Sequence, residues 1–135
     1  MTHRIARSRH LVRPVACPCG LPEPYEACCG RYHSGAAAAP TAEALMRSRY
    51  CAFVKGEAGY LLRTWHPRTR PGTLELDPGM RWTGLEILGT SGGSAFHSAG
   101  IVEFRAWYRG GSLHERSSFE RVDGVWVYVD GEFPV

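Results

Sequence analysis

Four of the chain's five cysteines lie within one short stretch, CPCGLPEPYEACCG at 17–30. Cys17 and Cys19 form one close pair, and Cys28 and Cys29 form another after a gap of eight residues. Cysteines that are adjacent or two apart bridge each other only under strain, and five is an odd number for a disulfide framework. Two close pairs that face each other across a short loop can instead offer four thiolates to one tetrahedral ion. The spacing therefore predicts a metal site, and zinc is the metal we expect there.

The spacing leaves the fourth ligand and the role of the site open. His33 lies four residues after Cys29 and could replace it, although we rank Cys29 first. A redox or sensor role for the thiols and an iron site are the alternatives to structural zinc. Four protein ligands leave no position for a substrate. We therefore expect the metal to contribute folding energy, on the order of 10 kcal/mol, rather than catalysis.

The remaining composition is that of an ordinary globular domain. A chain of 135 residues is the size of one domain, and its apolar and charged fractions, 44% and 21%, are close to globular averages and favour neither a disordered nor a fibrous class. No apolar run is long enough to span a membrane, and arginines interrupt the N-terminus where a signal peptide would be apolar. We expect a cytoplasmic protein without a membrane partner, and in that compartment clustered cysteines bind metals more often than they form disulfides.

The formal charge of +3 is concentrated at the N-terminus. Arg4, Arg7, Arg9 and Arg13 are accompanied by no acidic residue within 1–13. Such an arm can contact the phosphates of a nucleic acid, although a short solvated tail is the more ordinary interpretation.

Composition divides the chain into a basic flexible tail over 1–16, a cysteine-containing knuckle over 17–34 and a folded domain over 41–135. The domain begins with helical periodicity, with Thr41 as the N-cap and Gly56 as the end of a first helix. A second short helix is expected over 57–65. The positions expected to face inward are Met46, Tyr50, Phe53 and Val54 in the first helix and Leu61, Leu62 and Trp65 in the second.

From residue 81 onward the period changes to two, as in strands. Four segments rich in aromatic and β-branched residues, 81–89, 95–109, 112–122 and 125–130, are separated by glycine-containing turns. Two-residue turns at 110–111 and 123–124 would pair residue 109 with 112 and residue 122 with 125. The predicted fold is α+β, with helices packed on a curved antiparallel sheet. The face under the helices is expected to carry Val102, Phe104, Ala106, Tyr108, Leu113, Glu115, Ser117, Phe119, Trp126, Tyr128 and Asp130.

Several of these residues match a known family. The stretch CPCG, followed by Tyr25 and then by Cys28-Cys29-Gly30, resembles the SEC-C zinc motif found at the tail of the protein-translocation motor ATPase. The stretches TAEALMRSRYCAF, YLLRTWHP, HERSSF and VWVYVDG resemble the YchJ family, in which an SEC-C motif precedes a domain like nuclear transport factor 2 (NTF2). The resemblance covers residues 17–135.

This resemblance implies zinc on the four cysteines, a cone-shaped NTF2-like domain from about residue 41 to 135, and no established activity. The chain departs from the usual motif at two places. Gly20-Leu21-Pro22 stands where Gly-Ser-Gly is usual, and Glu23 and Glu26 are present where the translocation motor carries lysines.

The interior of the predicted cone is the second candidate site. In the register above, Asp130 lies opposite Ser117 with Glu115 nearby, and a buried carboxylate beside aromatic rings could act as a general base. The more ordinary interpretation is that the acids pair with Arg49 or Arg63 and that the helices fill the cone, with an arginine bound to Asp130. The candidate pocket residues are Tyr50, Trp65, Phe104, Tyr108, Glu115, Phe119, Trp126, Tyr128 and Asp130.

Cys51 and His66 are assigned structural roles. We expect Cys51 to be a small buried packing residue and His66 to cap the end of a helix. His97 and His114 fall on one hairpin, but the register pairs His114 with Trp107, so no second metal site is predicted there.

Two functions follow from these patterns. The first is a binding module, not an enzyme, that contacts a macromolecule such as the ribosome or a protein-translocation component through its knuckle and basic tail. The alternative is an enzyme or ligand-binding protein that holds a small molecule in the cone, and an open pocket would favour it.

Overall fold

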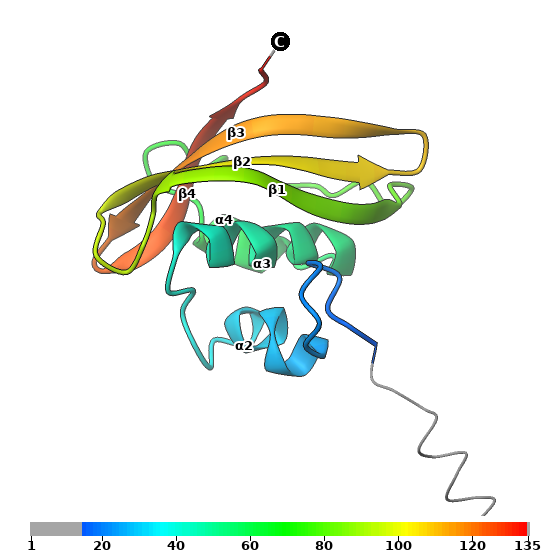
Figure 1. The fold of residues 1–135 in the computed structure, drawn as a ribbon, viewed down its shortest axis with the longest axis horizontal. Helices are drawn as coiled ribbons and strands as arrows, with labels where there is room; N and C mark the ends of the chain where they lie inside the picture. Colours follow the sequence, from blue (N-terminus) through cyan, green and yellow to red (C-terminus); the bar gives the residue numbers. More distant parts are fainter. Residues whose placement is uncertain (1–14, 135) are drawn as a thin grey trace, which may run out of the picture.

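The computed structural model describes residues 15–134, so the four N-terminal arginines lie outside the described residues. The knuckle contains the 3-10 helix η1 (Tyr25–Ala27) and helix α2 (Cys29–His33), and helices α3 (Ala42–Lys55) and α4 (Ala58–Arg63) follow. Strands β1 (Trp82–Gly92), β2 (Ala99–Tyr108), β3 (Gly111–Val122) and β4 (Val125–Glu132) form one antiparallel sheet in that order. Figure 1 shows three layers: the curved sheet, then α3 and α4, then the knuckle. This arrangement confirms the predicted α+β fold.

Helix α3 begins and ends where its sequence predicts. The hydroxyl of Thr41 accepts a hydrogen bond from the backbone N–H of Ala44 at 3.0 Å, which satisfies one of the free donors of the first turn. Gly56 ends the helix in the left-handed conformation, with a φ of 77°.

The buried positions of α3 are not the single stripe that its sequence suggested. Met46 and Tyr50 are buried, but Phe53 and Val54 are 36% and 37% exposed. Leu45, Ser48, Arg49, Cys51 and Ala52 are buried in addition. The reason is that α3 is covered twice, by the sheet on one side and by the knuckle on the other (Figure 1).

The two hairpins show how far the predicted register holds. Val122 pairs with Val125 around a turn at Asp123 and Gly124, which confirms the second hairpin. The first hairpin pairs Tyr108 with Gly111 instead of Arg109 with Ser112. This slip of two residues preserves the faces, because side chains alternate with a period of two.

A bulge in β4 overturns the expected position of Asp130. Phe119 pairs with Tyr128, but Ser118 pairs with Asp130, so the register skips Val129. One extra residue in a strand transfers the residues beyond it to the opposite face of the sheet. Asp130 is therefore exposed on the outer face instead of lying opposite Ser117 under the helices, and the ion pairs among residues 15–134 do not include it.

The segment that follows α4 is bound to the outer strand of the sheet. The backbone N–H of His66 donates to the carbonyl of Tyr128 at 2.7 Å, and the N–H of Tyr128 donates to Thr64 at 2.8 Å. These bonds hold Trp65 beside Tyr128, with their ring centroids 5.1 Å apart. Trp65 is thereby positioned under the sheet.

In the described part of the chain, no helix has the length and apolar character needed to cross a membrane.

Candidate metal centre and cone cavity

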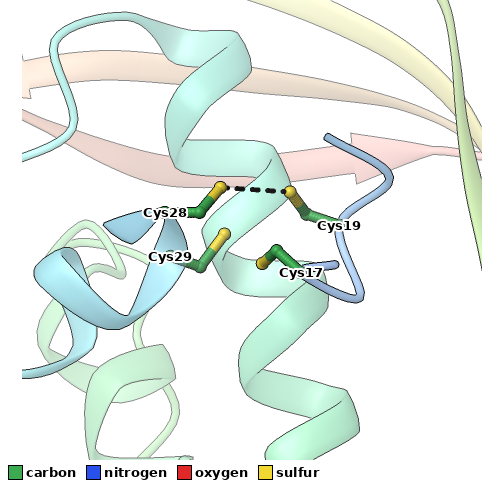
Figure 2. Close-up of side chains that lie close together, drawn as sticks. All are labelled: Cys17, Cys19, Cys28 and Cys29. Carbon is green, nitrogen blue, oxygen red and sulfur yellow. Dashed lines mark hydrogen bonds between the residues drawn. The ribbon is translucent and has the colours of Figure 1, made fainter. Parts of the chain in front are cut away.

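The knuckle brings four cysteine side chains to one point. Cys17 and Cys19 come from the turn before η1, Cys28 follows η1, and Cys29 begins α2. Their four sulfur atoms lie within 4.8 Å of one another, and each residue is at most 4% exposed. Figure 2 shows the two pairs facing each other. The Sγ atoms of Cys19 and Cys28 are 3.6 Å apart. A tetrahedral ion with metal–sulfur bonds of about 2.3 Å requires sulfurs roughly 3.8 Å apart, so the cluster can hold a metal ion.

Two glycines shape the backbone around these sulfurs for different reasons. Gly20 follows the first pair with a φ of 99°, which suits the turn in which its N–H donates to the carbonyl of Cys17. Gly30 lies within α2, where a Cβ atom would come within 2.8 Å of the carbonyl oxygen of Tyr25. Gly30 therefore allows close packing of η1 against α2.

His33 lies outside the cluster of sulfurs. Its Nε2 is 2.8 Å from the carbonyl oxygen of Ser48, to which it donates, and its Nδ1 is 2.6 Å from the hydroxyl of Tyr25. With Nε2 protonated, Nδ1 accepts from Tyr25, so both ring nitrogens have partners. The structure therefore brings the four cysteines together, whereas His33 connects Tyr25 to Ser48.

The fifth cysteine borders the cluster from helix α3. Cys51 is fully buried, and its sulfur is 3.8 Å from that of Cys17. A small buried side chain was expected at this position. Its contact with one of the four clustered cysteines was not expected. Nothing in the spacing of the first four cysteines indicates this contact, because Cys51 lies 34 residues after Cys17.

Without a metal, the four thiols of the cluster differ in pKa. A hydrogen bond from Cys29 lowers the pKa of Cys19 to about 5, whereas burial raises the pKa of Cys17 to about 12 and also raises that of Cys28. The pKa of Cys29 is raised by its hydrogen bond to Cys19. One thiolate is thus stabilised by neighbouring thiols. A dication would favour deprotonation of the other three.

The knuckle is docked on the domain by polar contacts as well as by the sulfurs. Arg47 donates to the carbonyl of Cys19 at 2.7 Å and forms an ion pair with Glu43 at 3.0 Å. Arg63 donates to the carbonyls of Tyr32 and His33 in the last turn of α2. These bonds join the metal centre to helices α3 and α4.

A second candidate site lies between the sheet and the helices. A cavity of about 220 Å³ opens there. The expectation that the helices fill the cone is therefore wrong. Two charged side chains line it, Arg49 from α3 and Glu115 from β3. The other lining residues are Met46, Tyr50, Phe53, Trp65, Trp82, Phe104, Ala106, Leu113, Ser117 and Tyr128.

The candidate pocket residues fall into three groups. Those that line the cavity are Tyr50, Trp65, Phe104, Glu115 and Tyr128. Phe119 and Trp126 are buried in the core, and Tyr108 packs edge-on against Trp82 with ring centroids 5.8 Å apart. Asp130 lies on the outer face, and its expected arginine partner is not found among the described residues.

Two cavity residues were missed or placed differently by sequence reasoning. Trp82 was not singled out, although it is the first aromatic residue of the strand region. Arg49 was expected to pair with an acid, but it is 4% exposed and lies over the rings of Tyr128 and Trp65. An arginine next to a tyrosine in an amphipathic helix gives no sequence signal for burial.

The remaining histidines form no further metal centre within residues 15–134. His114 pairs with Arg105 in the sheet instead of Trp107, and its Nε2 is 2.6 Å from the carboxylate of Glu103. His66 is 3.6 Å from Glu120. These contacts lie outside the cavity lining.

Comparison with known proteins gives consistent matches over the chain. Residues 41–131 match the family described as YchJ, middle NTF2-like domain. A UPF0225 protein of Streptomyces coelicolor is 80% identical over 117 residues, 87% of this chain and 94% of that protein. A UPF0225 protein of Corynebacterium glutamicum is 52% identical over 119 residues, 86% of this chain and 95% of that protein.

Solved structures match the same architecture. An SEC-C motif containing protein from Rhodopseudomonas palustris has a TM-score of 0.78 and 34% identity, covering 90% of this chain and 100% of that one. An SEC-C motif containing protein from Psychrobacter arcticus has a TM-score of 0.71 and 28% identity, covering 89% of this chain and 83% of that one.

Proposed function

This chain belongs to the YchJ family, and on that premise we propose that it is a binding protein whose knuckle is held together by a structural zinc ion. The ligands are Cys17, Cys19, Cys28 and Cys29. The observation that carries this proposal is the cluster of four buried sulfur atoms within 4.8 Å of one another. Four thiolates in a tetrahedral arrangement are typical of structural zinc. They leave no open coordination position, so the ion supplies stability instead of catalysis.

The zinc ion has a clear structural task in this arrangement. The knuckle contains only short helices and little apolar core of its own, and such modules depend on their metal for folding. Once folded, the knuckle covers the side of α3 that carries Ser48 and Cys51. The opposite side of α3 supplies Met46 and Tyr50 to the cavity. The metal therefore stabilises the helix that forms one wall of the cone.

Metal analysis tests this assignment. Protein purified without added metal is expected to contain one zinc per chain, and Cys28→Ser is expected to lose it. Cys51→Ser is the matched control, because it removes an equally buried thiol next to the cluster but outside the four-sulfur group. Loss of zinc in Cys51→Ser together with retention in Cys28→Ser would contradict the four-cysteine assignment.

A second proposal concerns a macromolecular partner such as the ribosome or a protein-translocation component. It is supported by the position of the arginine-rich segment 1–13, which carries four arginines and no acid directly before the first cysteine pair. Arginines in such an arm can contact the phosphates of RNA. The arm is thereby tethered to the part of the chain that the metal organises.

The partner proposal is best tested with the knuckle left intact, because removing it would uncover Ser48 and Cys51 on α3. We compare the natural chain with one in which Arg4, Arg7, Arg9 and Arg13 are replaced by Gln. The proteins recovered from lysate should differ, and binding by the natural chain should weaken as salt increases. Identical recovered proteins and identical salt dependence would exclude a role for the arm.

A further inference from the structure

The cone cavity contains a buried cation whose hydrogen-bonding capacity is only partly used. Arg49 donates from Nη1 to the carbonyl of Leu61 at 2.8 Å and to the hydroxyl of Thr64 at 2.7 Å. Within residues 15–134, each hydrogen bond of this guanidinium comes from Nη1. A guanidinium has five N–H donors, so Nε and Nη2 offer three more. Burial lowers the pKa of Arg49 to about 10, which leaves it charged at neutral pH.

A carboxylate lines the same cavity but does not neutralise this cation. Glu115 accepts hydrogen bonds from Ser117 at 2.6 Å and from Tyr128 at 3.3 Å, and both go to Oε2. The ion pairs in the described part of the chain include neither Arg49 nor Glu115. Each charge is instead held in place by its own neutral partners. Burying the charge of Arg49 without an ionic partner is costly, and a bound anion would reduce this cost.

Beyond Leu61 and Thr64, the neighbours of Arg49 include two aromatic rings. Its guanidinium lies over Tyr128 and Trp65, 4.6 Å and 5.1 Å from their ring centroids. Trp65 also has a buried indole Nε1–H that has no acceptor within the described residues. A buried donor without a partner is costly. This corner of the cavity therefore favours a ligand with acceptor oxygens.

The size and walls of the cavity restrict the ligand further. A volume of about 220 Å³ is below the roughly 300–1,000 Å³ of sites for drug-sized ligands, so the ligand is small. The rings of Tyr50, Trp65, Trp82, Phe104 and Tyr128 surround it. Aromatic walls favour a flat, apolar body. Oε1 of Glu115 accepts no hydrogen bond from the described residues, so it favours a donor group on that body.

We propose that the cavity binds a small aromatic carboxylic acid that carries a hydroxyl or amino group. Its carboxylate contacts Arg49, because the guanidinium fork matches a carboxylate in charge and geometry. Its hydroxyl or amino group donates to Glu115, and its ring lies between the aromatic walls. This site is separate from the zinc centre, since Arg49 and the cysteine cluster lie on opposite sides of α3.

A titration followed by NMR tests the proposal on the zinc-bound full chain. The indole N–H signals of Trp65 and Trp82 report directly on the cavity. The probes are 3-hydroxybenzoate, 4-hydroxybenzoate, 4-aminobenzoate, benzoate, phenol and benzylamine. We expect at least one substituted acid to saturate both signals with a Kd below about 1 mM, and benzoate, phenol and benzylamine to bind more weakly. Failure of all three substituted acids to saturate these signals in that range would overturn the proposal.

Three variants assign the binding to the named groups. Arg49→Met should weaken binding of the substituted acid at least about tenfold. Arg47→Met is the matched control, because it removes the same charge from the same helix on the side facing the knuckle, and it should bind normally. Glu115→Gln should reduce the preference for substituted acids over benzoate. Equal binding by Arg49→Met and the natural chain would contradict the assignment.

A cavity-filling variant protects the test against misfolding of Arg49→Met. Ala106 is buried and lines the cavity, so Ala106→Leu should block binding without removing a charge or a hydrogen bond. Circular dichroism and zinc content show whether each variant is folded. Undiminished binding by folded Ala106→Leu would place the ligand elsewhere and refute the proposal, even if Arg49→Met does not fold.

Discussion

His33 of the knuckle donates a hydrogen bond from Nε2 to the main-chain carbonyl of Ser48, in the middle of helix α3, over 2.8 Å. Because the other ring nitrogen is bound to Tyr25, the imidazole links η1 to α3 and does not join the cluster of sulfur atoms. The knuckle is therefore joined to the domain by a specific contact in addition to the cysteine cluster.

We predict that His33→Ala destabilises the folded chain but retains zinc. Two hydrogen bonds are lost and the Tyr25 hydroxyl loses its partner, which should reduce the free energy of unfolding by about 1–3 kcal/mol. Urea unfolding measures the loss, and metal analysis measures the zinc. His97→Ala is the control, since the ring of that exposed histidine bonds only to Ser94 among the described residues. A folded His33→Ala protein without zinc would identify His33 as a ligand after all.

Metal binding is predicted to release about three protons at pH 7. Of the four thiols, only Cys19 has its pKa lowered, to about 5. The other three thiols therefore remain protonated in the metal-free protein. The free protein thus carries more protons than the metal-bound protein, and the affinity must rise with pH and fall as the pH decreases towards 5. Calorimetric titration with zinc in buffers of different ionisation enthalpy counts the protons. Release of one proton or none would show that the thiols are already ionised.

We predict that Gly131→Ala is harmful although the residue is exposed. A Cβ atom at this position would overlap the carboxylate of Glu115, so either that side chain or the end of β4 must move. The expected loss in the free energy of unfolding is about 1–3 kcal/mol. Gly72→Ala is the matched control, because nothing lies within 4 Å of its added Cβ. Thermal unfolding of both variants checks this, and equal melting temperatures would show that Glu115 can move freely.

Asp130→Asn is predicted to leave stability and cavity binding unchanged. The side chain is exposed on the outer face, so the change in the free energy of unfolding should lie within about 0.5 kcal/mol. Urea unfolding and the NMR titration measure the two effects. A loss of ligand binding in Asp130→Asn would mean that the bulge in β4 does not separate this residue from the cavity.

Several features of the protein follow from local sequence alone. The close cysteine pairs indicate a metal site because a short loop can bring two such pairs onto one tetrahedral ion. Thr41 and Gly56 mark the ends of α3 because they satisfy the requirements of a helix start and end within a few residues. Asp123 and Gly124 indicate a tight hairpin for the same reason. In each case the determining interactions lie within one turn or one short loop.

Other features required the packing of segments that are distant in sequence. The bulge that moves Asp130 to the outer face depends on how β4 fits against β3, because alternation alone continues past Val129 without interruption. The burial of Arg49 and the contact of Cys51 with Cys17 depend on α3 being covered on two sides. The cavity between Arg49 and Glu115 exists only because the curved sheet and α3 leave space between them. Local patterns specify the backbone of each element and the direction of its side chains, whereas the space between elements is decided by tertiary contacts.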